Sequence, residues 1–277
     1  MREFSADYLR ETRRGMWADS RAALSDLDLP ARERVLDVGC GTGELTRVLA
    51  AETPGDVVGV DADRSLLAGV DAPVVRGDAR RLPFPDDSFD LVVCQALLIN
   101  LADPGAAVRE FARVSRDLVA AVEPDNGAVT VESTAGSEAR LARRARRLYL
   151  GGVATDVTLG ADAADLFADA GLDVVSTHRY DHERTVEPPY DASDVEAARR
   201  KASGEGLATD RETMLAGGAT PEEIDDLRAD WRAMGRTVVD QMQAGRYRRT
   251  ETVPFFLTVG RVPGAGPNTD AKTDTGT

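Results

Sequence analysis

The sequence predicts an α/β fold in which short buried strands alternate with amphipathic helices around a parallel sheet. Two observations lead to this class. Residues 35–50 read as an apolar strand, a glycine-rich turn and a helix with apolar residues at helical spacing. Three more apolar runs follow, and an acidic or polar residue stands at or soon after the end of each. With 277 residues, 42% of them hydrophobic, the chain can bury a core of this kind.

The turn after the first strand carries three glycines, Gly39, Gly41 and Gly43, in the spacing G-x-G-x-G. A dinucleotide-binding turn would instead read G-x-G-x-x-G. Glycine allows positive φ angles and lets a ligand approach the backbone closely. The segment is therefore predicted to bind a cofactor.

Acidic residues follow the strands in a fixed order. Asp37 ends the first strand, VVGVDAD ends the second at Asp61, and GDARRLPFPDDSFD supplies Asp78 after the third. The fourth strand, LVVCQA, opens into a turn at Gln95. Each acid taken alone could be a turn former or a cap. The ordered set favours a nucleoside-containing ligand, because an acid after the second strand binds ribose hydroxyls in many α/β folds.

On these motifs the chain resembles the class I S-adenosylmethionine-dependent methyltransferases, in the methyltransferase type 11 group that includes small-molecule enzymes. The resemblance is close over residues 34–131 and holds in outline beyond them. It implies a doubly wound, mostly parallel, seven-stranded Rossmann-like sheet with a helical insertion before the last strand. It also implies S-adenosylmethionine as cofactor, S-adenosylhomocysteine as product, and no metal.

The resemblance assigns roles to individual residues. Asp37 would orient the cofactor amino group, Asp61 would accept hydrogen bonds from both ribose hydroxyls, and Asp78 would accept from the adenine amine. Gln95 would lie near the transferred methyl group. The full implied cofactor set is Asp37, Gly39, Cys40, Gly41, Gly43, Asp61, Ala62, Asp78, Ala79 and Gln95.

The net charge of −14 comes with almost no lysine, only Lys201 and Lys272, and this balance resembles proteins of halophiles. An excess of acidic residues makes nucleic acid an unlikely partner, because binding depends on neutralising the phosphates. Concentrated salt screens charges and weakens this inference. Cys40 and Cys94 suit neither a disulfide framework nor a zinc site. Because no apolar run resembles a signal peptide or a membrane span, we expect a cytoplasmic enzyme without membrane contact. The enzyme is expected to be a monomer or a homodimer.

Five segments are expected along the chain: a helical segment at 1–30, the cofactor-binding core at 31–184, a helical insertion at 185–250, a final core strand at 251–263 and a disordered tail at 264–277. Within the insertion, Thr220, Pro221 and Glu223 predict a helix that begins with a capping box and runs to about Gln243. This insertion is a candidate lid over the substrate.

Residues for the methyl acceptor are less defined. Candidate catalytic residues are His182, Glu123 and Asn100, and candidate substrate contacts are Tyr8, Trp17, Tyr180 and Trp231. Each has an ordinary alternative: Glu123 begins a turn sequence ending in Asn-Gly, and Trp17 could simply pack on the sheet.

Three functions remain open from the sequence. The first is a methyltransferase acting on a small molecule. The second is a methyltransferase acting on RNA or protein, which rests on the arginines at 140, 143, 144 and 147 along one predicted helix. The third is a protein that binds the cofactor without turnover.

Overall fold

The structure is a computed structural model that describes residues 16–17 and 21–264. Two compact units are present. Unit 1 consists of Met1–Glu123, Ala161–Arg179 and Phe256–Thr277, and unit 2 of Pro124–Gly160 and Tyr180–Phe255. Residues 124–160 therefore group with most of the expected helical insertion rather than with the cofactor-binding core. The expected tail after residue 264, and most of the expected N-terminal helix, lie outside the described residues.

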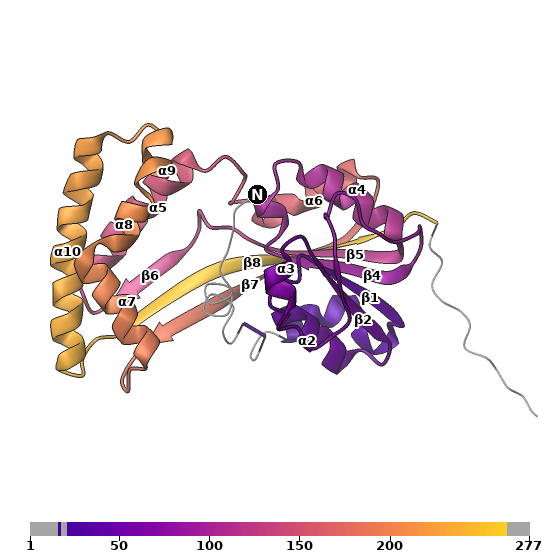
Figure 1. The fold of residues 1–277 in the computed structure, drawn as a ribbon, viewed down its shortest axis with the longest axis horizontal. Coiled ribbons are helices and arrows are strands. Elements are labelled where there is room, and N and C mark those ends of the chain that lie inside the picture. The colour runs from indigo at the N-terminus through magenta and orange to yellow at the C-terminus, as the bar shows by residue number, and fades with distance from the viewer. Residues whose placement is uncertain (1–15, 18–20, 265–277) are drawn as a thin grey trace, which may run out of the picture. The chain divides into compact units, whose positions relative to one another are not determined.

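The sheet of unit 1 is built from parallel strands β1 to β5 (Figure 1). Their bounds are β1 Arg34–Val38, β2 Asp56–Asp61, β3 Val74–Arg76, β4 Phe89–Gln95 and β5 Ser115–Pro124. In the strand order β3-β2-β1-β4-β5, the chain adds β2 and β3 on one side of β1 and then crosses to add β4 and β5 on the other side. Strand β8 (Arg249–Arg261) follows β5 in the order and pairs with β7 (Asp173–Val186), and both strands contribute residues to the two units. The predicted α/β class and largely parallel sheet are confirmed.

Helices cover both faces of the unit 1 sheet, with α2 on one side and α4 and α6 on the other (Figure 1). The helical elements are η1 Arg21–Leu27, η2 Leu29–Ala31, α2 Glu44–Glu52, α3 Arg64–Leu67, η3 Leu98–Asn100, α4 Pro104–Val114, η4 Gly160–Asp162 and α6 Ala163–Asp169. Helix α4 begins at Pro104 because Asp103 accepts a hydrogen bond from the Ala106 amide at 2.9 Å and proline suits the first helical position. Within the helical segment expected at 1–30, the described residues Arg21–Leu27 form the 3-10 helix η1.

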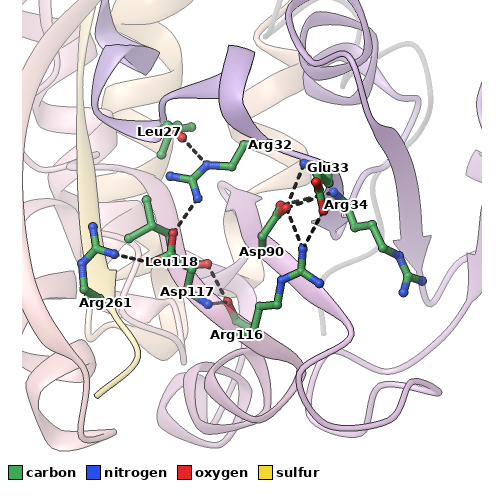
Figure 2. A network of polar contacts seen from close by, with 10 residues as sticks. Leu27, Arg32, Glu33, Arg34, Asp90, Arg116, Asp117, Leu118 and Arg261 are labelled. Carbon is green, nitrogen blue, oxygen red and sulfur yellow. Dashed lines mark hydrogen bonds and ion pairs between the residues drawn. The ribbon is translucent and has the colours of Figure 1, made fainter. Parts of the chain in front are cut away.

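At the amino ends of the strands, two acids hold the start of the sheet together (Figure 2). The Asp90 carboxylate accepts hydrogen bonds from the backbone amides of Glu33 at 2.8 Å and Arg34 at 3.3 Å. Asp117 lies between Arg32, at 2.6 Å, and Arg261. Because this network occupies the edge opposite to the predicted cofactor residues, it contributes to stability rather than to ligand binding.

Unit 2 has a hydrophobic core of its own. Its elements are β6 Thr130–Ser133, α5 Glu138–Gly152, α7 Ala192–Ser203, α8 Glu205–Thr209, α9 Arg211–Ala216 and α10 Pro221–Gln243, together with parts of β7 and β8. Helix α10 has the predicted capping box and ends at the predicted residue. Strand β6, which pairs antiparallel with β8, was not expected, so the described sheet has eight strands and the expected number of seven is wrong.

Unit 2 also contains a buried polar cluster centred on Glu138. Glu138 is 1% exposed, and its carboxylate contacts the Lys201 ammonium at 2.6 Å and the Tyr247 hydroxyl at 2.9 Å. Arg249 approaches the same carboxylate at 3.2 Å. Buried charges need such partners because leaving one unpaired is costly.

Candidate cofactor site

The glycine turn between β1 and α2 has the backbone that its sequence predicts. Gly39, Gly41 and Gly43 have φ angles of 72°, 55° and 81°, in the region that glycine enters without strain. The amides of Gly39 and Cys40 donate to the carbonyl of Val60 at 2.7 and 3.0 Å, which ties the turn to the end of β2. The Gly41 amide is directed to Asp61 instead.

Asp61, at the end of β2, is partly exposed and connects the glycine turn to the start of α3. One carboxylate oxygen accepts from the Gly41 amide at 2.9 Å and the other from the Asp63 amide at 2.8 Å. A carboxylate oxygen can accept two hydrogen bonds, so each retains room for one more donor. Two adjacent hydroxyls of a ribose would fit this arrangement. Ala62 follows directly, and its carbonyl accepts from Arg76 at 3.1 Å.

Asp37, in β1, is 1% exposed and faces helix α2. Its carboxylate accepts a hydrogen bond of 2.6 Å from the hydroxyl of Thr46, which is itself fully buried. Thr46 was not among the expected site residues. A polar residue on the buried side of the helix was the available signal, since Leu45 and Leu49 mark that side.

Asp78, after β3, makes a two-pronged ion pair with Arg80, whose Nε and Nη2 lie 3.1 and 2.8 Å from the two carboxylate oxygens. Hydrogen bonds from Arg80 hold the pKa of Asp78 below its usual value. The Asp78 side chain is still half exposed, while neighbouring Ala79 is buried. Arg80 was another partner that sequence reasoning missed.

The loop after β4 reaches the glycine turn. The side chain of Leu97 occupies the space beside Gly39, and a Cβ on that glycine would lie 2.8 Å from Leu97 Cδ1. Gln95 is buried, and its side-chain amide contacts two residues of the N-terminal segment, Trp17 Nε1 at 3.2 Å and Met16 Sδ at 2.8 Å. The structure therefore brings Trp17 together with Gln95, whereas Tyr8 lies outside the described residues.

Asn100 and Glu123 lie on either side of the same loop. Asn100 Nδ2 donates to the carbonyl of Ala96 at 2.8 Å, and its buried Oδ1 has no hydrogen-bond partner in the described part of the chain. Glu123 is completely buried, and its carboxylate accepts from the amides of Leu97 and Leu98 at 3.0 and 2.9 Å. Burial raises the pKa of Glu123 to about 7.

The remaining candidates belong to unit 2. Tyr180 stacks on Phe255 with ring centroids 5.8 Å apart, and His182 meets the same ring edge-on at 6.4 Å. His182 lies within strand β7, which continues to Val186, and it is 4% exposed. Trp231 packs partly buried against the unit 2 core.

The residues of unit 1 suit S-adenosylmethionine. They combine a glycine turn in which a Cβ on Gly39 would meet Leu97, the Asp61 carboxylate with room for two hydroxyl donors, and buried polar groups after β4. No group of three or more metal-binding side chains occurs in the residues that could be searched, 16–17 and 21–264. In the same residues no helix is long and apolar enough to cross a membrane.

Comparison with known sequences supports this assignment. Residues 36–118 match the methyltransferase domain family. Demethylmenaquinone methyltransferase from Roseiflexus castenholzii is 43% identical over 95 residues, which cover 31% of this chain and 40% of that protein. The enzyme of the same name from Lactiplantibacillus plantarum is 36% identical over 107 residues, covering 34% and 45%. The chain thus matches less than half the length of these relatives.

Solved structures agree at the level of the fold. A proposed methyltransferase from Bacillus halodurans superimposes with a TM-score of 0.53 at 16% identity, covering 89% of this chain and 99% of that one. The YcgJ protein of Bacillus subtilis gives 0.51 at 19% identity, with 88% and 98% covered. Residues 36–118 are therefore similar to a methyltransferase domain, and the chain shares the α/β fold of these solved structures.

Proposed function

We propose that this protein is an S-adenosylmethionine-dependent methyltransferase that acts on a small molecule. The observation that carries the proposal is the position of Asp61. Its carboxylate is oriented by the Gly41 and Asp63 amides and keeps one acceptor position on each oxygen. A nucleoside with two free ribose hydroxyls is the ligand class that matches these two positions beside a glycine turn.

The residues of unit 1 have three tasks in this reaction. Asp61 and Asp78 hold the nucleoside portion, the Gly39–Gly43 turn lets the cofactor approach the backbone, and Gln95 with Trp17 borders the reacting end. S-adenosylmethionine, when bound, supplies a methyl group on a positively charged sulfur that an acceptor can attack in line. Much of the rate enhancement then comes from holding donor and acceptor at reacting distance.

The acceptor is proposed to be a small molecule because two relatives that match part of this chain, over 95 and 107 residues, are named demethylmenaquinone methyltransferases. We assign acceptor selection to unit 2, including residues 185–250, which have a separate hydrophobic core and do not belong to the matched methyltransferase domain. His182 and Asn100 remain candidates for proton transfer, which is needed only where the acceptor atom carries a proton.

Binding of the cofactor is the first test. Calorimetric titration of S-adenosylhomocysteine in molar KCl should give micromolar affinity for the wild type and at least tenfold weaker affinity for Asp61→Ala, a loss of about 1.4 kcal/mol. Asp63→Ala is the matched control, since Asp63 is an acid two residues away whose side chain only caps α3 through Ser65. Equal losses in the two variants would contradict the assigned role of Asp61. No binding by folded wild type would refute the proposed function.

The acceptor class needs a separate experiment. Transfer of a labelled methyl group should be measured with a panel of quinones, phenols and amines, and in parallel with total RNA and a protein extract. Label recovered in small organic products supports the proposal, and label in RNA or protein contradicts it. Arg140, Arg143 and Arg147 are exposed on α5, so reversing these charges would then be the next step.

A further inference from the structure

The carboxylate of Glu123, at the carboxyl end of β5, is directed at the backbone of the loop that follows β4. Oε1 accepts from the amides of Leu97 at 3.0 Å and Leu98 at 2.9 Å, and Oε2 accepts from the Ile99 amide at 3.4 Å. The thiol of Cys94 lies 3.7 Å from Oε1. A single buried side chain therefore satisfies three consecutive backbone donors.

These donors belong to a segment whose conformation needs support. Ala96 has a φ of 48°, in the left-handed region that residues with a Cβ rarely adopt. Its amide is held by the Val122 carbonyl at 2.9 Å, one residue before Glu123. Strained backbone of this kind persists only where surrounding contacts hold it in place.

The same segment forms one wall of the candidate cofactor site. Leu97 lies against Gly39, so movement of residues 97–99 would change the space above the glycine turn. Gln95 and Asn100 stand at the two ends of the segment, and Asn100 donates back to the carbonyl of Ala96. The orientation of both side chains thus depends on how firmly the loop is held.

Proton transfer is a poor explanation for Glu123. Its side chain is inaccessible to solvent, and its oxygens already accept three amide hydrogen bonds. A base that acts on a ligand has to reach the proton that it removes.

We propose that Glu123 is a positioning residue that holds residues 97–99 against the glycine turn and thereby shapes the reacting end of the cofactor site. This inference rests on the proposed methyltransferase function. It gives a defined role to an acid that the sequence presented only as a candidate catalytic residue or as part of a turn.

The test compares two acids that hold backbone amides at opposite edges of the same sheet. Glu123→Gln keeps the size of the side chain but replaces one acceptor oxygen with a donor. Asp90→Asn makes the same change at the amino edge, where Asp90 holds the amides of Glu33 and Arg34 (Figure 2). Hydrogen exchange of the affected amides and affinity for S-adenosylhomocysteine are measured for both variants.

Amide exchange at 97–99 should rise at least tenfold in Glu123→Gln, and affinity for S-adenosylhomocysteine should fall at least tenfold. In Asp90→Asn, exchange should rise at 33–34 while affinity stays within threefold of wild type. Unchanged exchange at 97–99, or faster exchange with unchanged affinity, would overturn the proposal. An equal loss of affinity in Asp90→Asn would also overturn it, because the effect would then be general.

Two other outcomes of these measurements are also decisive. If Glu123→Gln does not fold, wild-type exchange decides: amides 97–99 must be protected as strongly as those of β4, and rapid exchange would overturn the proposal. If wild type binds no S-adenosylhomocysteine, the proposed function fails, but the exchange data still show separately whether Glu123 holds the loop.

Discussion

Protonation of Glu123 should make the stability of unit 1 depend on pH. Burial raises the pKa of this carboxyl from its ordinary value of 4.5 to about 7 in the folded protein, although three backbone amides favour the charged form. The titratable groups near it are Cys94, whose thiol pKa burial raises well above its usual range, and Asp37, which acts on that thiol. We propose Glu123→Gln, which cannot titrate, as the perturbation.

The sign follows from which state binds the proton more tightly. A folded-state pKa above the unfolded value means that the folded protein holds more protons between about pH 4.5 and pH 7. Stability from this group is therefore fully present below about pH 4.5 and is lost as the pH rises through 7. Since one pKa unit is worth about 1.4 kcal/mol, the difference between 4.5 and about 7 amounts to about 3 kcal/mol.

Urea unfolding between about pH 5 and pH 8 measures this effect. The chain has two tryptophans, Trp17 in unit 1 and Trp231 in unit 2, so a Trp231→Phe background lets fluorescence report on unit 1. The stability of wild type relative to Glu123→Gln should fall by about 2 to 3 kcal/mol across this range. Parallel stability curves for the two proteins would refute the reasoning, because they would mean that Glu123 titrates alike in both states.

Three further changes test individual contacts by urea unfolding. Thr46→Val should lower the free energy of unfolding by about 1.5–3 kcal/mol, because the buried Asp37 carboxylate loses the hydroxyl that donates to it at 2.6 Å. Thr46→Ser keeps this hydroxyl and should cost less, so equal losses in the two variants would contradict the prediction. Asp117→Asn should cost about 2 kcal/mol, since the Arg32 side chain is 9% exposed and loses a charged partner. The control is Glu196→Gln, which breaks the exposed ion pair of Glu196 with Arg199 on α7 and should change stability much less. Gly152→Ala would bring a Cβ within 1.6 Å of a backbone oxygen of α9. It should destabilise unit 2 by about 1–3 kcal/mol, while equal loss in unit 1 would argue against a local clash.

Local sequence patterns were sufficient for the strand–turn–helix of β1 and α2. Buried positions in β1 follow its apolar run, and the three glycines adopt positive φ as their spacing requires. The capping box of α10 was equally predictable, because Thr220 and Glu223 bond to each other's backbone amides without any distant partner. Such features depend on residues close in sequence.

Features that depend on distant partners were not predictable in the same way. Strand β6 is four residues long and alternates between exposed and half-buried positions, and it exists through pairing with β8 more than a hundred residues later. Within the site, the bond from Thr46 to Asp37 and the contact of Leu97 with Gly39 likewise require the folded arrangement. Sequence reasoning identified the acids but not the groups that hold them.

The edge of the sheet at which a buried acid lies helps to separate a functional role from a stabilising one. Asp90 and Glu123 are both buried carboxylates that accept backbone amides, and composition alone does not distinguish them. Asp90 holds the amino ends of the strands, where none of the candidate cofactor residues lies. Glu123 holds the loop that borders the glycine turn, at the carboxyl edge where ligands of open α/β sheets bind. Comparable chemistry at the two edges should therefore have unequal effects on ligand affinity, which is why the paired variants are informative even when both proteins lose stability.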